Sequence, residues 1–122
     1  MINAAEYDVL SLLPPAARTA TANGSSIDIK DYLGGGKIIL DSAAGGGTSP
    51  TMDVKVQDSA DNSSFADVSG LTFAQVVAAA SLQSMAVDLD QLRRYVRLVV
   101  TIGGTSPTFT CSAVLLAKKD NQ

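Results

Sequence analysis

The sequence contains no histidine among its 122 residues. Histidine is the general base of Ser-His-Asp and Cys-His sites and a ligand of nearly all catalytic zinc ions, so its absence excludes these chemistries. Asp88 and Asp90 lie on the same side of one predicted strand and could form a glycosidase pair. Adjacent carboxylates on a surface are usually solvated or paired with an arginine such as Arg93 or Arg94. We therefore expect no enzyme, no catalytic residue and no cofactor.

Aromatic and charged residues are also scarce. Tryptophan is absent, aromatic residues make up 5% of the chain, and nine basic and twelve acidic residues leave a net charge of -3. This composition gives no general attraction to phosphate backbones or anionic lipids, and it leaves few rings on which bases could stack. We expect neither nucleic acid nor a membrane as a partner.

Cys111 is the only cysteine, so no intramolecular disulfide can form and a reducing, intracellular site of synthesis fits. Its place in an alternating strand, on the same side as Phe109 and Leu115, predicts a buried core residue rather than a reactive thiol. No apolar run approaches the roughly 18 residues that span a bilayer, and the N-terminus has no basic region. We expect neither a signal peptide nor a membrane anchor.

Alternation of apolar and polar residues predicts β-strands through most of the chain. The clearest case is residues 51–57, in which Met52, Val54 and Val56 share one face. Residues 19–30 predict a hairpin around Asn23-Gly24 with one buried face. Further strands are expected at 85–89, 94–102 and 108–116 and, as an inner strand, at 37–41, whereas 71–83 favour a strand followed by a loop.

The segment Gly-Gly-Thr-Ser-Pro-Thr occurs twice, at residues 46–51 and again at 103–108. Each copy joins an apolar strand to an alternating one, which predicts equivalent connections at exposed ends of the fold and two long antiparallel pairs, 37–57 and 95–116. Seven or eight short strands with almost no helix predict an all-β, two-sheet antiparallel sandwich of jelly-roll or Ig-like type, with the jelly roll preferred.

The ends of the chain differ from its middle. Residues 1–16 end in Pro14-Pro15 and predict an N-terminal arm or edge strand, 17–117 form the sandwich domain, and 118–122 are a polar tail that we expect to fray. Four apolar residues of the arm have no clear partner in the sandwich, and we expect them to contact a neighbouring subunit or another protein: Val9, Leu10, Leu12 and Leu13. The arm should therefore matter more for attachment than for folding.

Polar residues gather in two places. The cluster 58–64 contains Asp58, Asp61 and Asn62 and predicts a turn capped by its own side chains; it lacks the spacing of a calcium loop, so we expect no metal site. Arg93 and Arg94, with Tyr95 and Arg97 nearby, predict a polar sheet face or a subunit contact rather than a nucleic-acid site.

Residues 54–68 resemble galactose-binding-like and discoidin-like jelly rolls, in which an alternating strand leads through a Ser/Asp-rich turn to an aromatic residue and a valine. Residues 88–98 resemble the strand that precedes the closing hairpin of those folds. Together with the second Gly-Gly-Thr-Ser-Pro-Thr copy, residues 37–117 are similar to head decoration (cement) proteins of tailed bacteriophages.

This resemblance implies a non-enzymatic virion protein, made in the host cytoplasm, that binds the major capsid protein on the outer surface of the shell in many copies. It also implies a homo-oligomer, with a trimer favoured. The rival interpretation is a carbohydrate-binding or adhesin module of a phage tail. Its candidate residues are Tyr7, Tyr32 and the 58–64 loop.

Overall fold

The structure, a computed structural model, describes residues 6–119 of the chain. Within this range it contains eight strands and one short 3-10 helix, Leu89–Gln91, and none of its helices has the length and hydrophobicity to cross a membrane. The strands are β1 (Tyr7–Arg18), β2 (Ala22–Asn23), β3 (Ile27–Asp28), β4 (Tyr32–Ser42), β5 (Gly46–Ser59), β6 (Ala66–Thr72), β7 (Ser81–Asp88) and β8 (Tyr95–Lys119).

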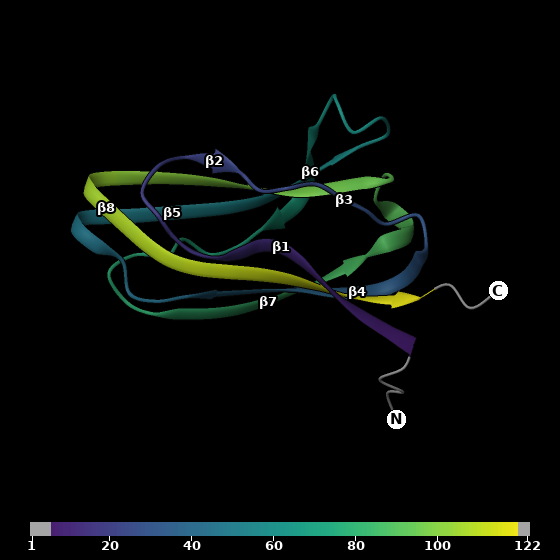
Figure 1. Cartoon of the computed structure of the whole chain (residues 1–122), viewed down its shortest axis with the longest axis horizontal. Helices are drawn as coiled ribbons and strands as arrows, with labels where there is room; N and C mark the ends of the chain where they lie inside the picture. Colours follow the sequence, from purple (N-terminus) through teal and green to yellow (C-terminus); the bar gives the residue numbers. More distant parts are fainter. Residues whose placement is uncertain (1–5, 120–122) are drawn as a thin grey trace.

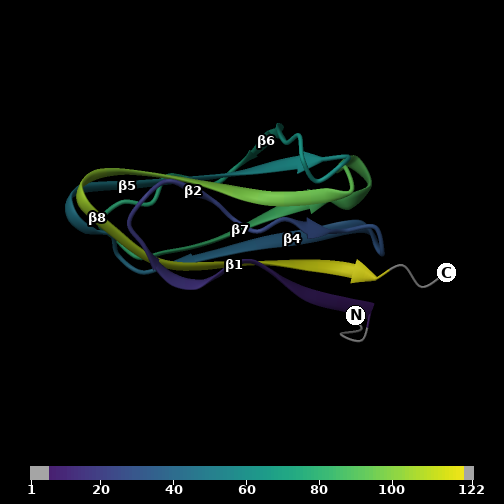
Figure 2. The same cartoon turned by 45° about the horizontal axis from the view of Figure 1, so that its top comes forward.

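The strands form two layers, which Figures 1 and 2 show one above the other. Sheet A has the order β1, β8, β4, β7, and sheet B has the order β6, β5, β8, with β2 and β3 along the other side of β8. Strand β8 belongs to both sheets, because residues 95–108 pair in sheet B and 109–119 pair in sheet A. Every pairing is antiparallel, and most connections cross between the layers, as in a jelly roll. The predicted fold class is confirmed.

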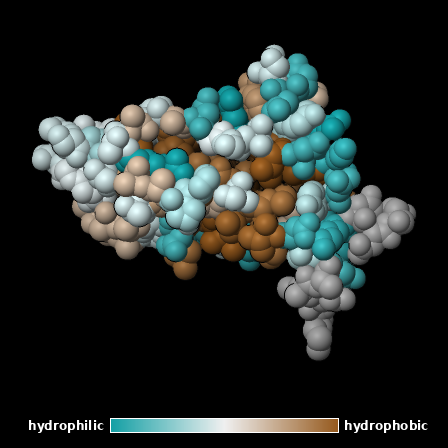
Figure 3. All heavy atoms as spheres, viewed as in Figure 1, coloured by the Kyte–Doolittle hydropathy of each residue, from teal (hydrophilic) through white to brown (hydrophobic). Residues whose placement is uncertain are grey.

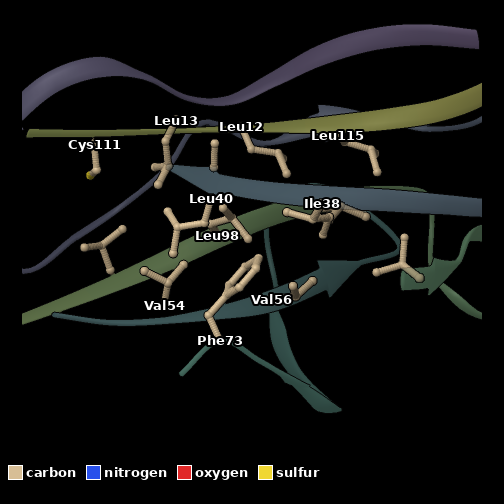
Figure 4. Packing of buried hydrophobic residues seen from close by; sticks show 14 of the residues in the cluster. Leu12, Leu13, Ile38, Leu40, Val54, Val56, Phe73, Leu98, Cys111 and Leu115 are labelled. Atoms are coloured by element: carbon tan, nitrogen blue, oxygen red, sulfur yellow. The ribbon is translucent and has the colours of Figure 1, made fainter. Parts of the chain in front are cut away.

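The core lies between the sheets and takes alternate residues of the inner strands. Met52, Val54 and Val56 are at most 1% exposed, as their alternation predicts. In Figure 4 the side chains of Ile38 and Leu40 from sheet A point toward those of sheet B. Cys111 is 3% exposed, so its predicted core position is confirmed, and burial raises the pKa of its thiol.

The two copies of the repeated segment pair with each other. Gly46 lies opposite Thr108, Thr48 opposite Thr105 and Thr51 opposite Gly103, so a local two-fold axis passes between Thr48 and Thr105. The backbones match as well: Ser49 and Ser106 both have a φ of 49°, while Gly47 and Gly104 have φ values of 93° and 112°. The predicted equivalence of the two connections is therefore confirmed.

Each copy carries the chain from one sheet to the other instead of reversing it within a sheet, and Figure 1 shows both bends at the left end of the molecule. The expected pairs 37–57 and 95–116 are wrong as hairpins. β4 and β5 each pair with β8 instead, with Ile39 opposite Val114 and Val54 opposite Val100. A bend of this kind lets the apolar sides of the two strands that it joins face each other across the core. A hairpin would place both strands in one sheet.

The predicted hairpin over 19–30 is also wrong. β2 and β3 do not pair with each other but follow the edge of β8, where Gly24 N–H donates to the Leu98 carbonyl at 2.7 Å. This pairing satisfies backbone groups of β8 that a local hairpin would leave open. The expected strand followed by a loop over 71–83 is confirmed, since β6 ends at Thr72 and β7 begins at Ser81.

β1 is an edge strand of sheet A, the second of the two alternatives for residues 1–16. Leu12 and Leu13 are 0% and 1% exposed, so the expectation that they lack a partner in the sandwich is wrong. The pairing with β8 shifts register between Ser11 and Leu13, and a bulge of this kind lets two consecutive residues face the core. The sandwich thus begins at β1, and Lys118 and Lys119 belong to β8. Residues 1–5 and 120–122 of the predicted arm and tail lie outside the described residues.

We expect Gly104→Ala and Gly47→Ala each to lower the free energy of unfolding by about 1 to 3 kcal/mol, because both residues have positive φ. A Cβ at Gly104 would also lie 2.7 Å from the Ser49 carbonyl oxygen. Gly46→Ala is the matched control, since its Cβ would have no neighbour closer than 3.8 Å. Urea denaturation of the three variants measures the difference; equal stability of all three would contradict the two-fold description of the bends.

We expect Leu12→Ala to lower the free energy of unfolding by about 2 to 5 kcal/mol, because it empties a fully buried site. Val9→Ala in the same strand should change it by less than about 0.5 kcal/mol, since Val9 is 67% exposed. Thermal and urea unfolding compare the two variants. Wild-type stability of Leu12→Ala would mean that β1 is an arm with no part in folding.

Candidate interaction surface

The outer face of sheet B is polar and its side chains bind one another. Lys55 Nζ lies 2.9 Å from a carboxylate oxygen of Asp67, and Gln57 Nε2 donates to the other oxygen at 2.8 Å. Arg97 donates to Gln57 Oε1 from two nitrogens, at 3.0 and 2.8 Å, and its guanidinium stacks 4.0 Å from the centre of the Phe65 ring. The charges of this face are therefore largely engaged within the chain.

The outer face of sheet A carries exposed apolar residues among polar ones. Its cross-strand neighbours form rows, one with Val9, Leu116, Lys37 and Ala86, and the next with Ser11, Val114, Ile39 and Ser84. Leu82 of β7, opposite Asp41, follows in a third row and is 73% exposed. We call the six apolar residues of this surface the apolar face: Val9, Ile39, Leu82, Ala86, Val114 and Leu116.

Two hollows of about 370 Å³ lie at the two ends of this surface. One is lined by Tyr7, Lys37, Ala86 and Leu116 around Gly35 and Gly36, where β4 has no side chains to fill the sheet surface. The other is lined by residues that include Pro15, Asp41 and Ser112. Figure 3 shows hydrophobic side chains gathered over β1 and the adjoining part of β8, whereas the loop beyond β6 is hydrophilic.

Two strands under the apolar face contain apolar runs that include residues of both sides. In β4 the run Ile38-Ile39-Leu40 interrupts the alternation, and in β8 the run 113–117 contains no polar residue. Uninterrupted apolar runs are typical of strands covered on both faces. The described chain covers only the inner face, which leaves the apolar face as a candidate contact with another protein.

The structure separates the six contact residues predicted from the sequence. Val9 lies on the apolar face, Leu10 is partly buried against the core, and Leu12 and Leu13 lie inside the core. The two leucines are therefore unavailable for contact, a correction that follows from the bulge in β1. Sequence reasoning missed Ile39, Leu82, Val114 and Leu116, although the apolar runs in β4 and β8 were a visible signal for three of them.

Arg93 and Arg94 are tied to other parts of sheet B. Arg93 Nε donates to one carboxylate oxygen of Asp58 at 2.9 Å, and its backbone N–H donates to the other at 3.0 Å. Arg94 makes a fork to the carboxylate of Asp28, at 2.8 to 3.1 Å, which holds β3 against β8. Both arginines thus join strands, and their contact with a partner stays a prediction.

The loop 58–64 is capped by its own side chains, as predicted. The Asp61 carboxylate accepts from the backbone N–H groups of Ser63 and Ser64 at 2.9 Å and from the Ser59 hydroxyl at 2.8 Å. These hydrogen bonds lower the pKa of Asp61 to about 2. One Asp61 oxygen is thus engaged within the loop, Asp58 binds Arg93, and Asn62 Oδ1 accepts from the Ser26 hydroxyl at 2.6 Å. Residues 6–119 contain no cluster of three carboxylates or thiols arranged to hold a metal ion.

Tyr32 joins the start of β1 to β4. Its hydroxyl donates to an oxygen of Asp8 at 2.7 Å, and the other oxygen of Asp8 lies 3.2 Å from Lys119 Nζ. The hydrogen bond to Asp8, together with burial and the negative charge of Asp8, raises the pKa of Tyr32 to about 12. The hydroxyl proposed for sugar binding is thus used to fasten β1 to its sheet.

No model of a known protein family matches the sequence, and no curated protein matches it. Among solved structures, the chain is similar to the SPBc2 prophage-derived protein YomS, known from a crystal structure, with 12% sequence identity and a TM-score of 0.52. The similarity covers 89% of this chain and 94% of that chain. At this identity the likeness shows a shared fold, and no residue role is carried over from it.

We expect an alkaline titration followed by tyrosinate absorbance to show one component with a midpoint near pH 12, which is absent in Tyr32→Phe. Asp8→Asn should move that component toward lower pH, because it removes the negative charge beside the hydroxyl. A folded-state pKa raised above the reference value of 10.0 stabilises the fold below pH 10, and this contribution is lost as the pH rises toward 12. A single midpoint for all tyrosines of the wild type would contradict the Tyr32–Asp8 contact.

Proposed function

We propose that this protein is a non-enzymatic structural protein of a phage particle and binds the outer surface of the capsid in many copies through the apolar face of sheet A. The observation that carries the proposal is that face, on which Val9 and Leu82 are 67% and 73% exposed beside three further partly exposed aliphatic residues. Contiguous apolar patches on a chain of this size mark protein contacts. In this proposal the partner is the major capsid protein.

One similarity supports a phage particle as the setting: the fold is shared with a prophage-derived protein. The sequence without histidine fits a protein that acts by binding and not by catalysis. The chain would be made in the host cytoplasm and would end on the outside of the assembled shell.

The test uses shells assembled from the major capsid protein of the same phage without this protein. We expect the wild-type chain to co-sediment with such shells in many copies and to raise their melting temperature. Val9→Asp combined with Val114→Asp should weaken binding at least about tenfold, because both changes place a charge in the contact. The matched control is Ser69→Asp, an exposed position on β6 of sheet B.

The outcomes separate the face from the function. Equal binding by the apolar-face variant and the wild type would overturn the assignment of this face. Failure of the wild type to bind any shell, together with retention of a defined glycan on an array, would overturn the capsid proposal in favour of the carbohydrate-binding module.

A further inference from the structure

The edge of sheet A formed by β7 is open and regular. Within residues 6–119, β7 pairs only with β4, and its register from Ser81 to Asp88 has no shift. Proteins usually protect such an edge with proline, charged side chains or a bulge. The opposite edge, β1, has two prolines and two register shifts, whereas β7 has no proline, no bulge and a single charged residue, Asp88, at its end.

The edge is also held in a fixed position before any partner binds. Gln83 Oε1 accepts from Ala74 N–H, and Gln83 Nε2 donates to the Ala74 carbonyl, both at 2.9 Å. The loop that contains Ala74 is fastened in turn to β5 by a bridge between Val76 and Met52. A strand ordered in this way loses little further freedom when it pairs with another strand.

We propose that β7 pairs antiparallel with β7 of a second copy of this chain, across a two-fold axis at Ser84. In β7 the even-numbered residues point outward and are exposed, and directly opposite residues of an antiparallel pair share a face. An axis at Ser84 places Leu82 opposite the partner's Ala86, so the two apolar side chains meet on the outer face. All of residues 81–87 then have a partner.

The adjacent strand carries opposite charges at the two ends of each row in this register, about 14 Å apart, and they are compatible with it without deciding it. Asp41 lies beside Leu82, and Lys37 lies beside Ala86. In the proposed dimer each row therefore reads Asp41, Leu82, the partner's Ala86 and the partner's Lys37, with opposite charges at its two ends. An axis at Met85 would instead place Leu82 opposite the carboxylate of the partner's Asp88, which gives neither apolar contact nor charge balance.

The pairing would join two four-stranded sheets into one continuous sheet. Because the two-fold axis of an antiparallel pair is perpendicular to the sheet, the apolar faces of both copies would lie on the same side. This consequence rests on the proposed function, since it would present one wider surface to the capsid. The dimer itself does not depend on it.

The decisive measurement is disulfide cross-linking together with sedimentation of the full chain. Ser84→Cys should give a disulfide-linked dimer, since position 84 lies opposite itself with Cα atoms about 4.5 to 5.5 Å apart. Leu82→Cys is the matched control, because the two copies of position 82 would be about 13 Å apart along the strands. Cross-linking through Met85→Cys and not through Ser84→Cys would overturn the register.

A charge pair tests the contact without cysteine. Leu82→Lys should raise the dissociation constant of the dimer at least about tenfold, and adding Ala86→Glu to the same chain should restore it, because each new ammonium then meets a carboxylate. Circular dichroism confirms that both variants fold, and Val9→Lys on the opposite edge should leave the dimer unchanged. A monomer or a trimer as the wild-type species would overturn the proposal.

Shell binding distinguishes this inference from the proposed function. A cross-linked dimer that binds no shell leaves the dimer standing and contradicts the capsid role. A wild-type monomer that still binds shells would contradict pairing between copies and leave the capsid role standing.

Discussion

The structure depends on the pairing of the two Gly-Gly-Thr-Ser-Pro-Thr segments with each other. Because Thr48 lies opposite Thr105, the chain from β4 to β5 changes sheets at the same point as β8, and the two remain neighbours through the change. Each bend thereby gives one central strand to each sheet: β4 and β8 lie at the centre of sheet A, and β5 and β8 at the centre of sheet B. The remaining strands add to the sides of these central strands, and the core lies between the two sheets.

Much of this fold could be predicted from the sequence, but the strand partners could not. The alternation at Met52, Val54 and Val56 identified the strand and its buried side. A glycine-rich connection between two amphipathic strands is compatible with a hairpin or with a bend between sheets, and only contacts with distant residues decide between them. Leu12 and Leu13 were misassigned because the prediction took Pro14-Pro15 to separate residues 1–16 from the sandwich, whereas a bulge in β1 lets both leucines face the core.

The candidate surface was predictable only in part, for a related reason. Val9 was identified because it had no apparent partner, whereas Leu82 looks like any apolar residue of an alternating strand. Its outward direction follows from the register of β7 against β4. The run Ile38-Ile39-Leu40 did indicate a strand covered on both sides, yet residues 6–119 cover one side only. In the proposal above, the partner protein covers the other side.

Strand β8 has a consequence for how the protein is made. Five other strands hydrogen-bond to it, and only β6 and β7 attach through β5 and β4 instead. It is also the last of the described strands to leave the ribosome. Neither sheet can form completely before residue 95 and those after it have emerged. Until then the core-facing apolar side chains of the earlier strands remain uncovered. Such late, non-local closure makes folding slow and exposes the nascent chain to aggregation, which favours post-translational folding assisted by chaperones.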